Sequence, residues 1–539
     1  MLTKLTFQAV ALAALCAGAI APAMAEDAAP GPETTWVGQF RINGKTTAIT
    51  LHDRSATKGA ASVLDIPAMG AREVPLVHVE LTPTHSQFSL QGGPDLYTFD
   101  GAPTKAGMTG SVKQGAASGD FTLIKLMPTD MVLNRALSGS YQVAPGHVID
   151  IGVMSEIGGQ LVFLDQKTLR EGPLYQLGAS KFASGPTLGV AWPFALHVEF
   201  VKNGNGAVTG LRWQEGKQRF SARKIAPHRV EDVTIVHDGV TLKGSLTLPR
   251  KPGPHPAVVF AHGSGEATRD QAMWNMFFVR QGIAVLSLDK RGAGESGGDW
   301  HKASLDEIAG DWLAGVAMLK QRADIDAKRI GVHGSSQGGW TSAMMAVRSP
   351  DIAYVIVRAG SANTVADTMV HEIGWSVREA GLSEADAQEA MDGSRTMFGL
   401  AGAPWVQFNA AATPMKAKRW AHAAWAIHMS EAGWGRPWSA LNVHYDPAAT
   451  LAAVKVPVLW FLGDLDHNVP SAATAVLLDK ARAASGNGDF TVVHLPDAGH
   501  AFIATKTGNS AEFMSSTHFA AGYWDKMEVW LREHQFSRP

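Results

Sequence analysis

The chain has 539 residues, too long for one ordinary hydrophobic core, so we expect two or three domains. With 45% hydrophobic and 18% charged residues, the composition is that of a globular protein. The net charge is only −2, so no basic field would attract nucleic acid, and nucleic acid is not an expected partner.

Residues 1–25 have the features of a secretory signal peptide. Lys4 supplies the positive start, the run AVALAALCAGAIAPA supplies the apolar part, and Ala23 and Ala25 fit the cleavage rule for small residues. The apolar run is short for a membrane span, and no other segment is long enough, so the mature chain should lack an integral membrane segment. We therefore expect an exported protein, periplasmic or secreted.

The chain contains a single cysteine, Cys16, which lies inside the predicted signal peptide. The mature chain would then have neither disulfides nor thiol chemistry, although an exported protein could form disulfides. Leu15 stands before Cys16 where a lipoprotein signal needs a small residue, so a lipid anchor is not expected.

Residues 26–226 read as all-β, in two modules at 26–127 and 128–226. The phrase TTWVGQFRINGKTTAITLHD alternates apolar and polar residues around an Asn-Gly turn, and a second series of short strands starts near Leu137. Each module has about a hundred residues, a usual domain size. The sequence leaves two roles open for them: binding a polymer or cell-envelope component, or packing against and shielding a catalytic region.

Residues 227–539 change to an alternation of strands and helices. A hairpin is followed by apolar strands separated by helices, and one helix opens with a capping box of Ser304 and Glu307. This alternation predicts a largely parallel sheet covered by helices. Residues 361–448 interrupt it with a helical stretch that we expect to form a cap; it holds six tryptophans, at positions 375, 405, 420, 425, 434 and 438.

The stretch RIGVHGSSQGGW contains a candidate nucleophile. Gly-x-Ser-x-Gly between a strand and a helix is the pattern of a nucleophile elbow, in which small residues flank a sharp turn. The pattern fits when it is centred on Ser336, whereas centring it on Ser335 would put His333 and Gln337 at the glycine positions. Ser336 is therefore the candidate and Ser335 its neighbour.

An acid and a base follow Ser336 in the order that serine hydrolases of this architecture require. The loop WFLGDLDHNVP offers Asp464 and Asp466, and VVHLPDAGHAF offers His500, both directly after apolar strands. A serine hydroxyl needs a base within hydrogen-bonding reach, and a carboxylate would orient that base. An earlier strand ends in HGSGEA; a backbone N–H from this loop and that of Gln337 would form an oxyanion hole.

These motifs make residues 230–539 resemble the α/β-hydrolase superfamily, and secreted bacterial esterase- and peptidase-like members in particular. The resemblance rests on HGSG, DKRGAGES, GSSQGGW, GDLDHNVP and a final GH, in that order. It implies that Asp466 is the acid, and that Ser264 gives the oxyanion N–H. It also implies that Asp289 and Arg291 form an ion pair that orders a loop. The chain has HGSG where lipases of the superfamily carry HGGG, which weakens a lipase assignment.

The remaining histidines have simpler interpretations. His333 is expected to pack within a strand, and His467 to face solvent beside the acid loop. His371, His422 and His428 lack the spacing of metal ligands, so we expect neither a metal nor another cofactor.

We expect a serine hydrolase that cleaves a carboxylic ester through an acyl-serine intermediate. The substrate would be a small ester or a short acyl or peptidyl compound, and the sequence specifies no oligomeric state. The same machinery would also suit a thioesterase, an acyl-peptidase or an aminopeptidase. An aminopeptidase needs carboxylates facing Ser336, for which Glu266, Glu372 and Glu379 are candidates.

Overall fold

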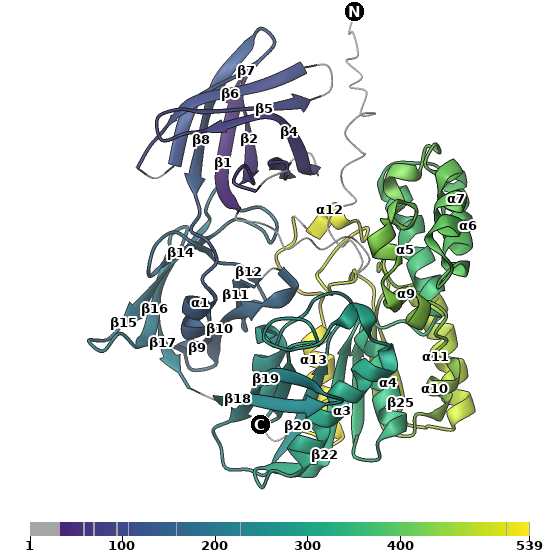
Figure 1. The fold of residues 1–539 in the computed structure, drawn as a ribbon. Helices are drawn as coiled ribbons and strands as arrows, with labels where there is room; N and C mark the ends of the chain where they lie inside the picture. Colours follow the sequence, from purple (N-terminus) through teal and green to yellow (C-terminus); the bar gives the residue numbers. More distant parts are fainter. Residues whose placement is uncertain are drawn as a thin grey trace, which may run out of the picture.

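The computed structural model describes residues 33–537, except 58–59, 68–70, 93–94, 106, 158, 227 and 514. The predicted signal peptide lies outside these residues, and export of the protein stays a prediction. Figure 1 shows two β modules on one side of a sheet-and-helix region, with a group of helices on its other side. No helix of the described residues is long and apolar enough to cross a membrane.

The first β module is a closed barrel of eight antiparallel strands. Four phenylalanines pack at its centre, where the rings of Phe88 and Phe99 stack with their centroids 4.4 Å apart and both contact Phe121 edge-on. Side chains therefore fill the barrel. Its strands are β1 (Thr34–Ile42), β2 (Lys45–Asp53), β3 (Val63–Ile66), β4 (Ala71–Leu81), β5 (Ser86–Gly92), β6 (Asp95–Pro103), β7 (Gly107–Gln114) and β8 (Ala117–Lys125).

The second β module is an open antiparallel sheet of nine strands. It is preceded by a short helix, α1 (Met131–Leu137), which the all-β reading missed although Asp130 caps it by accepting a hydrogen bond from Leu133 N. The strands are β9 (Gly139–Ala144), β10 (His147–Met154), β11 (Gln160–Asp165), β12 (Glu171–Pro173), β13 (Tyr175–Gln176), β14 (Lys181–Ser184), β15 (Leu196–Lys202), β16 (Val208–Glu215) and β17 (Gln218–Ile225).

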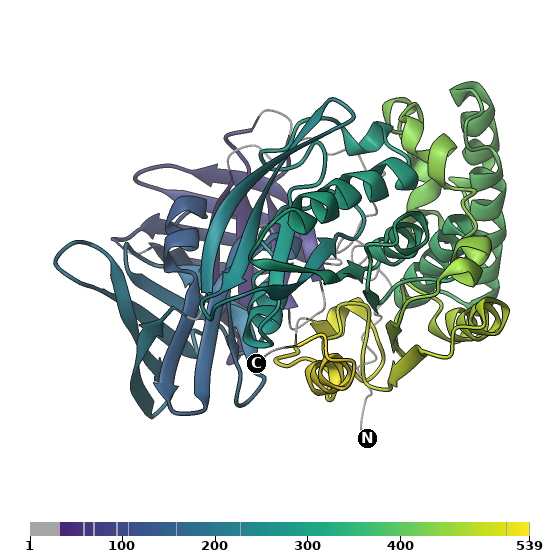
Figure 2. The same ribbon diagram turned by 90° about the horizontal axis from the view of Figure 1, so that it is seen from below.

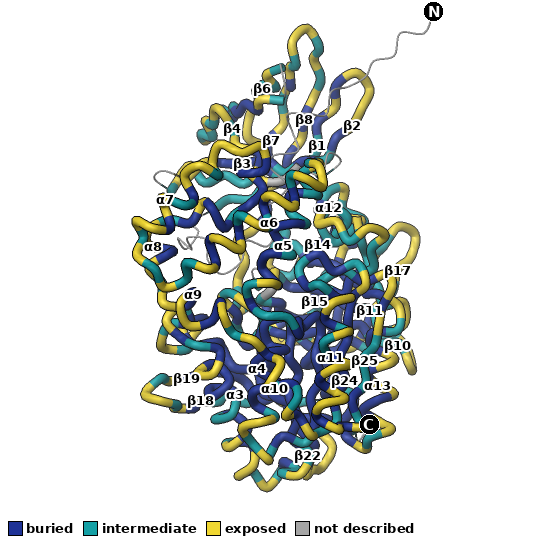
Figure 3. Tube along the Cα trace, turned by 90° about the vertical axis from the view of Figure 1, so that its right-hand side faces the viewer, coloured by how far each residue is buried: buried dark blue, intermediate teal, exposed yellow. Residues whose placement is uncertain are grey.

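The largest sheet has eight strands in the order β18-β19-β21-β20-β22-β23-β24-β25. β19 is antiparallel to both neighbours, and all pairs from β21 onward are parallel, which confirms the predicted, largely parallel sheet. Every residue of β20, β21, β23 and β24 is buried, as Figure 3 shows for the centre of this region. The strands are β18 (His228–His237), β19 (Val240–Pro249), β20 (His255–Ala261), β21 (Ala284–Leu288), β22 (Ile325–Ser335), β23 (Tyr354–Arg358), β24 (Val458–Gly463) and β25 (Phe490–Leu495).

Helices cover both faces of this sheet (Figure 2). Val259 of β20 faces a core that includes Trp312, whereas its neighbour Val258 faces another core, with Trp274 and Phe278. The predicted capping box at Ser304 is present. The helices outside the cap are α2 (Ala272–Arg280), α3 (Leu305–Lys320), α4 (Gly338–Arg348), α10 (Ala448–Ala453), α11 (Ser471–Ser485), α12 (Ser510–Phe513) and α13 (Tyr523–Glu533), with the 3₁₀ turn η4 (Trp300–Lys302).

The helical insertion between β23 and β24 forms the green group of helices in Figure 1. Trp420, Trp434 and Trp438 are buried in its interior, continuous with one core of the sheet, so these three tryptophans serve packing. Its elements are α5 (Val365–Glu379), α6 (Glu384–Gly399), α7 (Trp405–Met415), η5 (Ala421–Ala423), η6 (Trp425–His428), α8 (Glu431–Trp434) and α9 (Pro437–Asn442).

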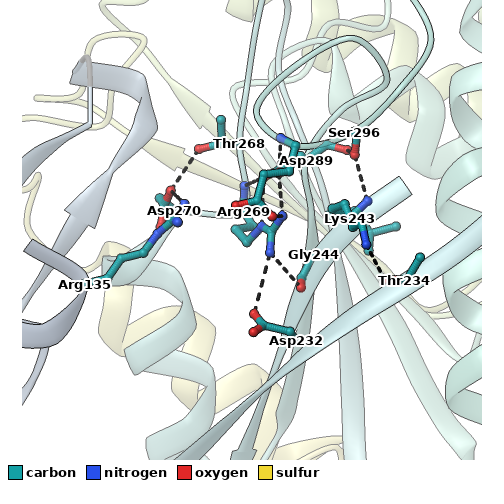
Figure 4. Close-up of polar contacts among 12 residues, drawn as sticks. Arg135, Asp232, Thr234, Lys243, Gly244, Thr268, Arg269, Asp270, Asp289 and Ser296 are labelled. Carbon is teal, nitrogen blue, oxygen red and sulfur yellow. Dashed lines mark hydrogen bonds and ion pairs between the residues drawn. The ribbon is translucent and has the colours of Figure 1, made fainter. Parts of the chain in front are cut away.

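The second β module packs directly on the sheet-and-helix region. Arg135 donates to both carboxylate oxygens of Asp270, at 3.1 and 2.8 Å (Figure 4). Farther along the contact, the backbone N–H of Glu171 donates to Thr517 O at 2.9 Å. Met154 of this module shares an apolar core with helices α2 and α13. The two parts therefore have a common core as well as polar contacts.

Candidate active site

Ser336 lies at the sharp turn between β22 and α4. Its φ of 53° is in the left-handed region, which residues other than glycine rarely adopt. A Cβ on Gly334 would lie 2.3 Å from the carbonyl oxygen of Gly338, and one on Gly338 would lie 2.1 Å from that of Ala261. Backbone atoms thus occupy the space that side chains would need, and both flanking positions require glycine. The turn has the strained geometry of a nucleophile elbow.

Ser336, His500 and Asp466 form a chain of hydrogen bonds, although they are far apart in the sequence. Nε2 of His500 lies 3.1 Å from the Oγ of Ser336. Nδ1 of the same ring lies 2.9 Å from Oδ2 and 3.1 Å from Oδ1 of Asp466. Because a carboxylate can only accept, Nδ1 carries the proton and Nε2 is left to accept one from the serine hydroxyl.

The two aspartates of the acid loop have different surroundings. The side chain of Asp466 is fully buried, and its Oδ1 also accepts from the backbone N–H groups of Asn468 and Val469, both at 2.8 Å. Asp464 is exposed and contacts His494 at 2.7 Å instead. The structure therefore brings Asp466, and not Asp464, to His500.

Two effects act on the imidazole of His500. Burial disfavours its charged form, but the adjacent Asp466 carboxylate outweighs burial, and the pKa of His500 lies above its usual value. Glu372, in the cap helix α5, adds to the same upward shift of this pKa. His500 is therefore a base whose proton affinity is increased by its acidic neighbours.

The loop after β20 lies directly against the elbow. A Cβ on Gly263 would be 3.4 Å from the carbonyl oxygen of Ser335 and 3.5 Å from the Cβ of Ser336. Gly265 has a φ of 76°, which bends this loop in a way that favours glycine. The backbone on either side of Ser264 can thus come close to a group bound at Ser336.

Ser335 has a structural partner. Its hydroxyl, which is buried, accepts a hydrogen bond from Nη2 of Arg358 at 2.5 Å. Arg358 stands at the end of β23, and its Nη1 donates to the carbonyl oxygen of Ala501, next to His500, at 3.2 Å. Its guanidinium also lies over the ring of Trp274. Through these hydrogen bonds, Arg358 links the elbow, at Ser335, to the loop that carries His500.

The prediction that Asp289 and Arg291 form an ion pair with each other is wrong. Asp289 accepts from Nη2 and from the backbone N–H of Arg269, each at 2.7 Å (Figure 4). Arg291 donates instead to Asp311 of α3, at 2.7 Å. A turn closed by the hydrogen bond from Ala293 N to Lys290 O begins after Asp289, and the two side chains contact different elements.

The expectation that His467 faces solvent is also wrong. Only 8% of this residue is exposed, because the cap helix α5 covers the acid loop. Its ring stacks on Trp375 with centroids 3.7 Å apart, and its Nδ1 lies 2.6 Å from a carboxylate oxygen of Glu379. Glu379 also accepts from Ser510 N at 3.3 Å, so this carboxylate joins the cap to two loops.

The three candidate acids for binding an amine differ in position. Glu266 is exposed, and Glu379 is occupied by His467. Glu372 lies near His500 and Asp466 and accepts a hydrogen bond from Asn468; burial raises the pKa of Glu372 to about 7. Of the three, Glu372 is the one whose charge acts on His500.

His333 is completely buried between Phe260 and Phe278, and burial lowers its pKa to about 3, which confirms that it is a packing residue. His428 lies 2.8 Å from Ala421 O, within the cap. Across the described residues, no three or more histidine, cysteine or acidic side chains are grouped so that they could hold a metal ion.

Sequence reasoning missed two buried cations beside the elbow, Lys290 and Arg358. Lys290 stands two residues after strand β21, in AVLSLDKRG, and Arg358 is the last residue of β23, in YVIVRAG. A cation at the carboxyl end of a buried strand was the available signal, because that end of an α/β sheet carries the site. The partners of these two side chains come from segments far away in the sequence, which a local pattern does not reveal.

Comparison with known families gives a match to part of the chain. Residues 238–500, just under half of the chain, match the family described as X-Pro dipeptidyl-peptidase (S15 family). The matched segment begins in the hairpin of β18 and β19 and ends at His500, so it contains Ser336 and Asp466 as well.

Two curated relatives are hydrolases. The chain is 24% identical over 342 residues to the esterase EstD of Thermotoga maritima, covering 60% of this chain and 74% of that protein. It is 28% identical over 163 residues to 2,6-dihydropseudooxynicotine hydrolase of Paenarthrobacter nicotinovorans, covering 28% of this chain and 43% of that one. Among solved structures, an esterase of Pyrococcus furiosus aligns with 57% of this chain and 91% of its own, with 18% identity and a TM-score of 0.36.

The sheet order, the elbow and the family match define the region from β18 onward as an α/β-hydrolase. The chain is accordingly a serine hydrolase of the broad group that contains esterases and S15-type peptidases, and it carries two β modules ahead of that region.

Proposed function

We propose that the protein cleaves a carboxylic ester through an acyl-serine intermediate, with Ser336 as nucleophile, His500 as general base and acid, and Asp466 as the orienting carboxylate. The observation that carries this proposal is the imidazole of His500, which bridges the Ser336 hydroxyl and the buried Asp466 carboxylate. This arrangement gives an otherwise weak nucleophile a base within hydrogen-bonding distance.

In the first half-reaction, Nε2 of His500 takes the hydroxyl proton while Oγ of Ser336 attacks the ester carbonyl carbon. The oxygen of the tetrahedral intermediate accepts hydrogen bonds from the backbone N–H groups of Ser264 and Gln337. His500 then gives its proton to the leaving alkoxide, and an acyl-serine and an alcohol result. In the second half, His500 activates a water molecule that hydrolyses the acyl-serine.

Labelling with a fluorophosphonate, followed by assays on a substrate panel, tests this proposal. We expect the label on Ser336, and turnover of p-nitrophenyl esters of graded acyl length. Acyl thioesters and aminoacyl p-nitroanilides of matched acyl groups complete the panel, because the same machinery suits these bonds. No label on Ser336, or faster turnover of thioesters or anilides than of esters, would contradict ester cleavage as the main activity.

The pH dependence of kcat/KM for an ester should follow the ionisation of His500. Only the neutral ring can accept the Ser336 proton, and Asp466 and Glu372 hold its pKa above the usual value of about 6.5. Activity is therefore expected to rise with pH and to reach half its plateau above about pH 6.5. A variant at an exposed histidine, His494→Gln, is the control and should keep the wild-type profile. A midpoint well below that value would contradict this assignment of the base.

Glu372 and the family match favour an aminopeptidase or dipeptidyl-peptidase activity as the second candidate. A carboxylate beside His500 could bind the α-amine of a short peptide. If so, Glu372→Gln should raise KM for aminoacyl p-nitroanilides by about tenfold or more, because one charge-assisted hydrogen bond to the substrate is lost. KM for esters should stay unchanged.

The matched control for this variant is Glu266→Gln, which changes an exposed carboxylate after the HGSG loop. It should leave both classes of substrate unaffected. Equal anilide KM values for Glu372→Gln and wild type would rule out the amine-binding role of Glu372.

A further inference from the structure

A buried lysine, Lys290, lies beneath the loop expected to form the oxyanion hole. The residue is 1% exposed. Its Nζ donates to the carbonyl oxygens of Gly263 at 2.8 Å and Gly265 at 3.0 Å, and to Oε1 of Gln337 at 3.1 Å. An ammonium group has three N–H donors, so these contacts use all of them. Lys290 thus binds both sides of the proposed oxyanion hole: the HGSG loop and the residue after the nucleophile.

All three acceptors of Lys290 are neutral oxygens. The carboxylate of the preceding residue, Asp289, pairs with Arg269. Nζ of Lys290 also lies 5.4 Å from the ring centroid of Trp300. Burial lowers the pKa of Lys290 to about 7. Burying an ammonium group at this position therefore costs hydration free energy, and the hydrogen bonds to the surrounding carbonyl oxygens offset that cost.

The geometry of the peptide group connects Lys290 to the oxyanion. The carbonyl of Gly263 and the N–H of Ser264 belong to one planar trans peptide, so they point in opposite directions. Because Lys290 holds that carbonyl, it turns the Ser264 N–H away from itself. Gly263 lies against Ser336, so this orientation is set directly beside the reacting group.

Neighbouring contacts hold the rest of the same loop. The backbone N–H of Lys290 donates to Ala267 O at 3.0 Å. Asp289 accepts from the backbone N–H of Arg269 at 2.7 Å, a contact near the centre of Figure 4. The segment DKRGAGES therefore acts as a template for the loop, with Lys290 at the end nearest Ser336.

We propose that Lys290 is a positioning residue that fixes the Ser264 and Gln337 N–H groups toward the oxyanion of the tetrahedral intermediate. This inference rests on the proposed function. It assigns the lysine a role in the transition state and not in ground-state binding of substrate. The bond to Gly263 O orients the Ser264 N–H, the bond to Gln337 Oε1 holds the residue that carries the second N–H, and both N–H groups are used fully only when the oxyanion forms.

Lys290→Met tests this proposal, since methionine keeps an unbranched stem and removes the three donors. We expect kcat for a p-nitrophenyl ester to fall about 100-fold, the loss seen when one oxyanion donor is removed, with KM within about threefold. The inhibition constant of an alkylboronic acid, which forms a tetrahedral adduct with an active serine, should rise in parallel with the loss of kcat. The control Lys243→Met removes a lysine whose Nζ donates to the surface residue Thr234, and it should behave as wild type.

A folded Lys290→Met variant with kcat within about threefold of wild type, or with unchanged boronate affinity, would overturn the proposal. If that variant does not fold, Gln337→Met keeps the lysine and removes one acceptor; a tenfold or larger loss of kcat with weaker boronate binding is then expected, and unchanged values would overturn the proposal. Failure of the proposed function looks different: wild-type Ser336 would not react with fluorophosphonate at all.

Discussion

Replacing Ser336 with alanine should lower kcat for ester hydrolysis by about 10³-fold or more, the range found when the nucleophile of such a site is removed. Alanine removes the hydroxyl that contacts Nε2 of His500, so His500 has no group to activate and no acyl-enzyme can form. The variant should also lose fluorophosphonate labelling, whereas its thermal unfolding should stay close to that of wild type, because one part-buried hydroxyl is removed.

Ser335→Ala is the matched control for this prediction, since it removes the adjacent hydroxyl of the same turn. Ser335 contacts Arg358 and not His500, so we expect a loss of kcat of about tenfold or less. Equal losses from the two variants, or an active Ser336→Ala enzyme, would exclude Ser336 as the nucleophile.

Asp466→Asn should reduce kcat on the order of 10⁴-fold, the effect of the equivalent change in a serine-histidine-aspartate site. The amide keeps the size of the carboxylate but can donate to Nδ1, which favours the imidazole tautomer that carries its proton on Nε2. That tautomer cannot accept the proton of Ser336. Steady-state kinetics over a range of pH measures the effect, and the loss should persist at high pH, where a simple change of pKa would be overcome.

The control for Asp466→Asn is Asp464→Asn, two residues earlier in the same loop. Asp464 is exposed and contacts His494, so kcat should stay within about twofold of wild type. A large loss from Asp464→Asn together with a small one from Asp466→Asn would reverse the assignment of the acid.

The sequence was sufficient for features that depend on local spacing. Two glycines four positions apart favoured Ser336 over Ser335 as the centre of the elbow, and at both glycines backbone oxygens leave no room for a Cβ. Strand and helix periodicity likewise predicted the parallel sheet and the helix that begins after Ser304, because these follow from the alternation of buried residues along the chain.

Features that depend on distant partners could not be predicted in this way. Asp289 and Arg291 look like a pair because they are close in sequence, but each is bound by a residue about 20 positions away. His467 was expected in solvent since nothing in its own loop indicates that helix α5 covers it. The role of Lys290 can be recognised only in the structure, where two segments far apart in the sequence, the HGSG loop and Gln337, meet at its Nζ.

The contact between the second β module and the hydrolase region affects where the enzyme can be divided. Arg135 donates to Asp270, in the loop that begins with the HGSG motif. The N–H of Glu171 donates to Thr517 O, in a segment that follows His500. Met154 lies in the core shared with α2 and α13. A chain starting at β18 would expose that apolar face to water and lose support on both sides of the site. The change of pattern near residue 227 is thus a boundary of architecture, and we expect a chain that starts at the second module to unfold at a higher temperature than one that starts at β18.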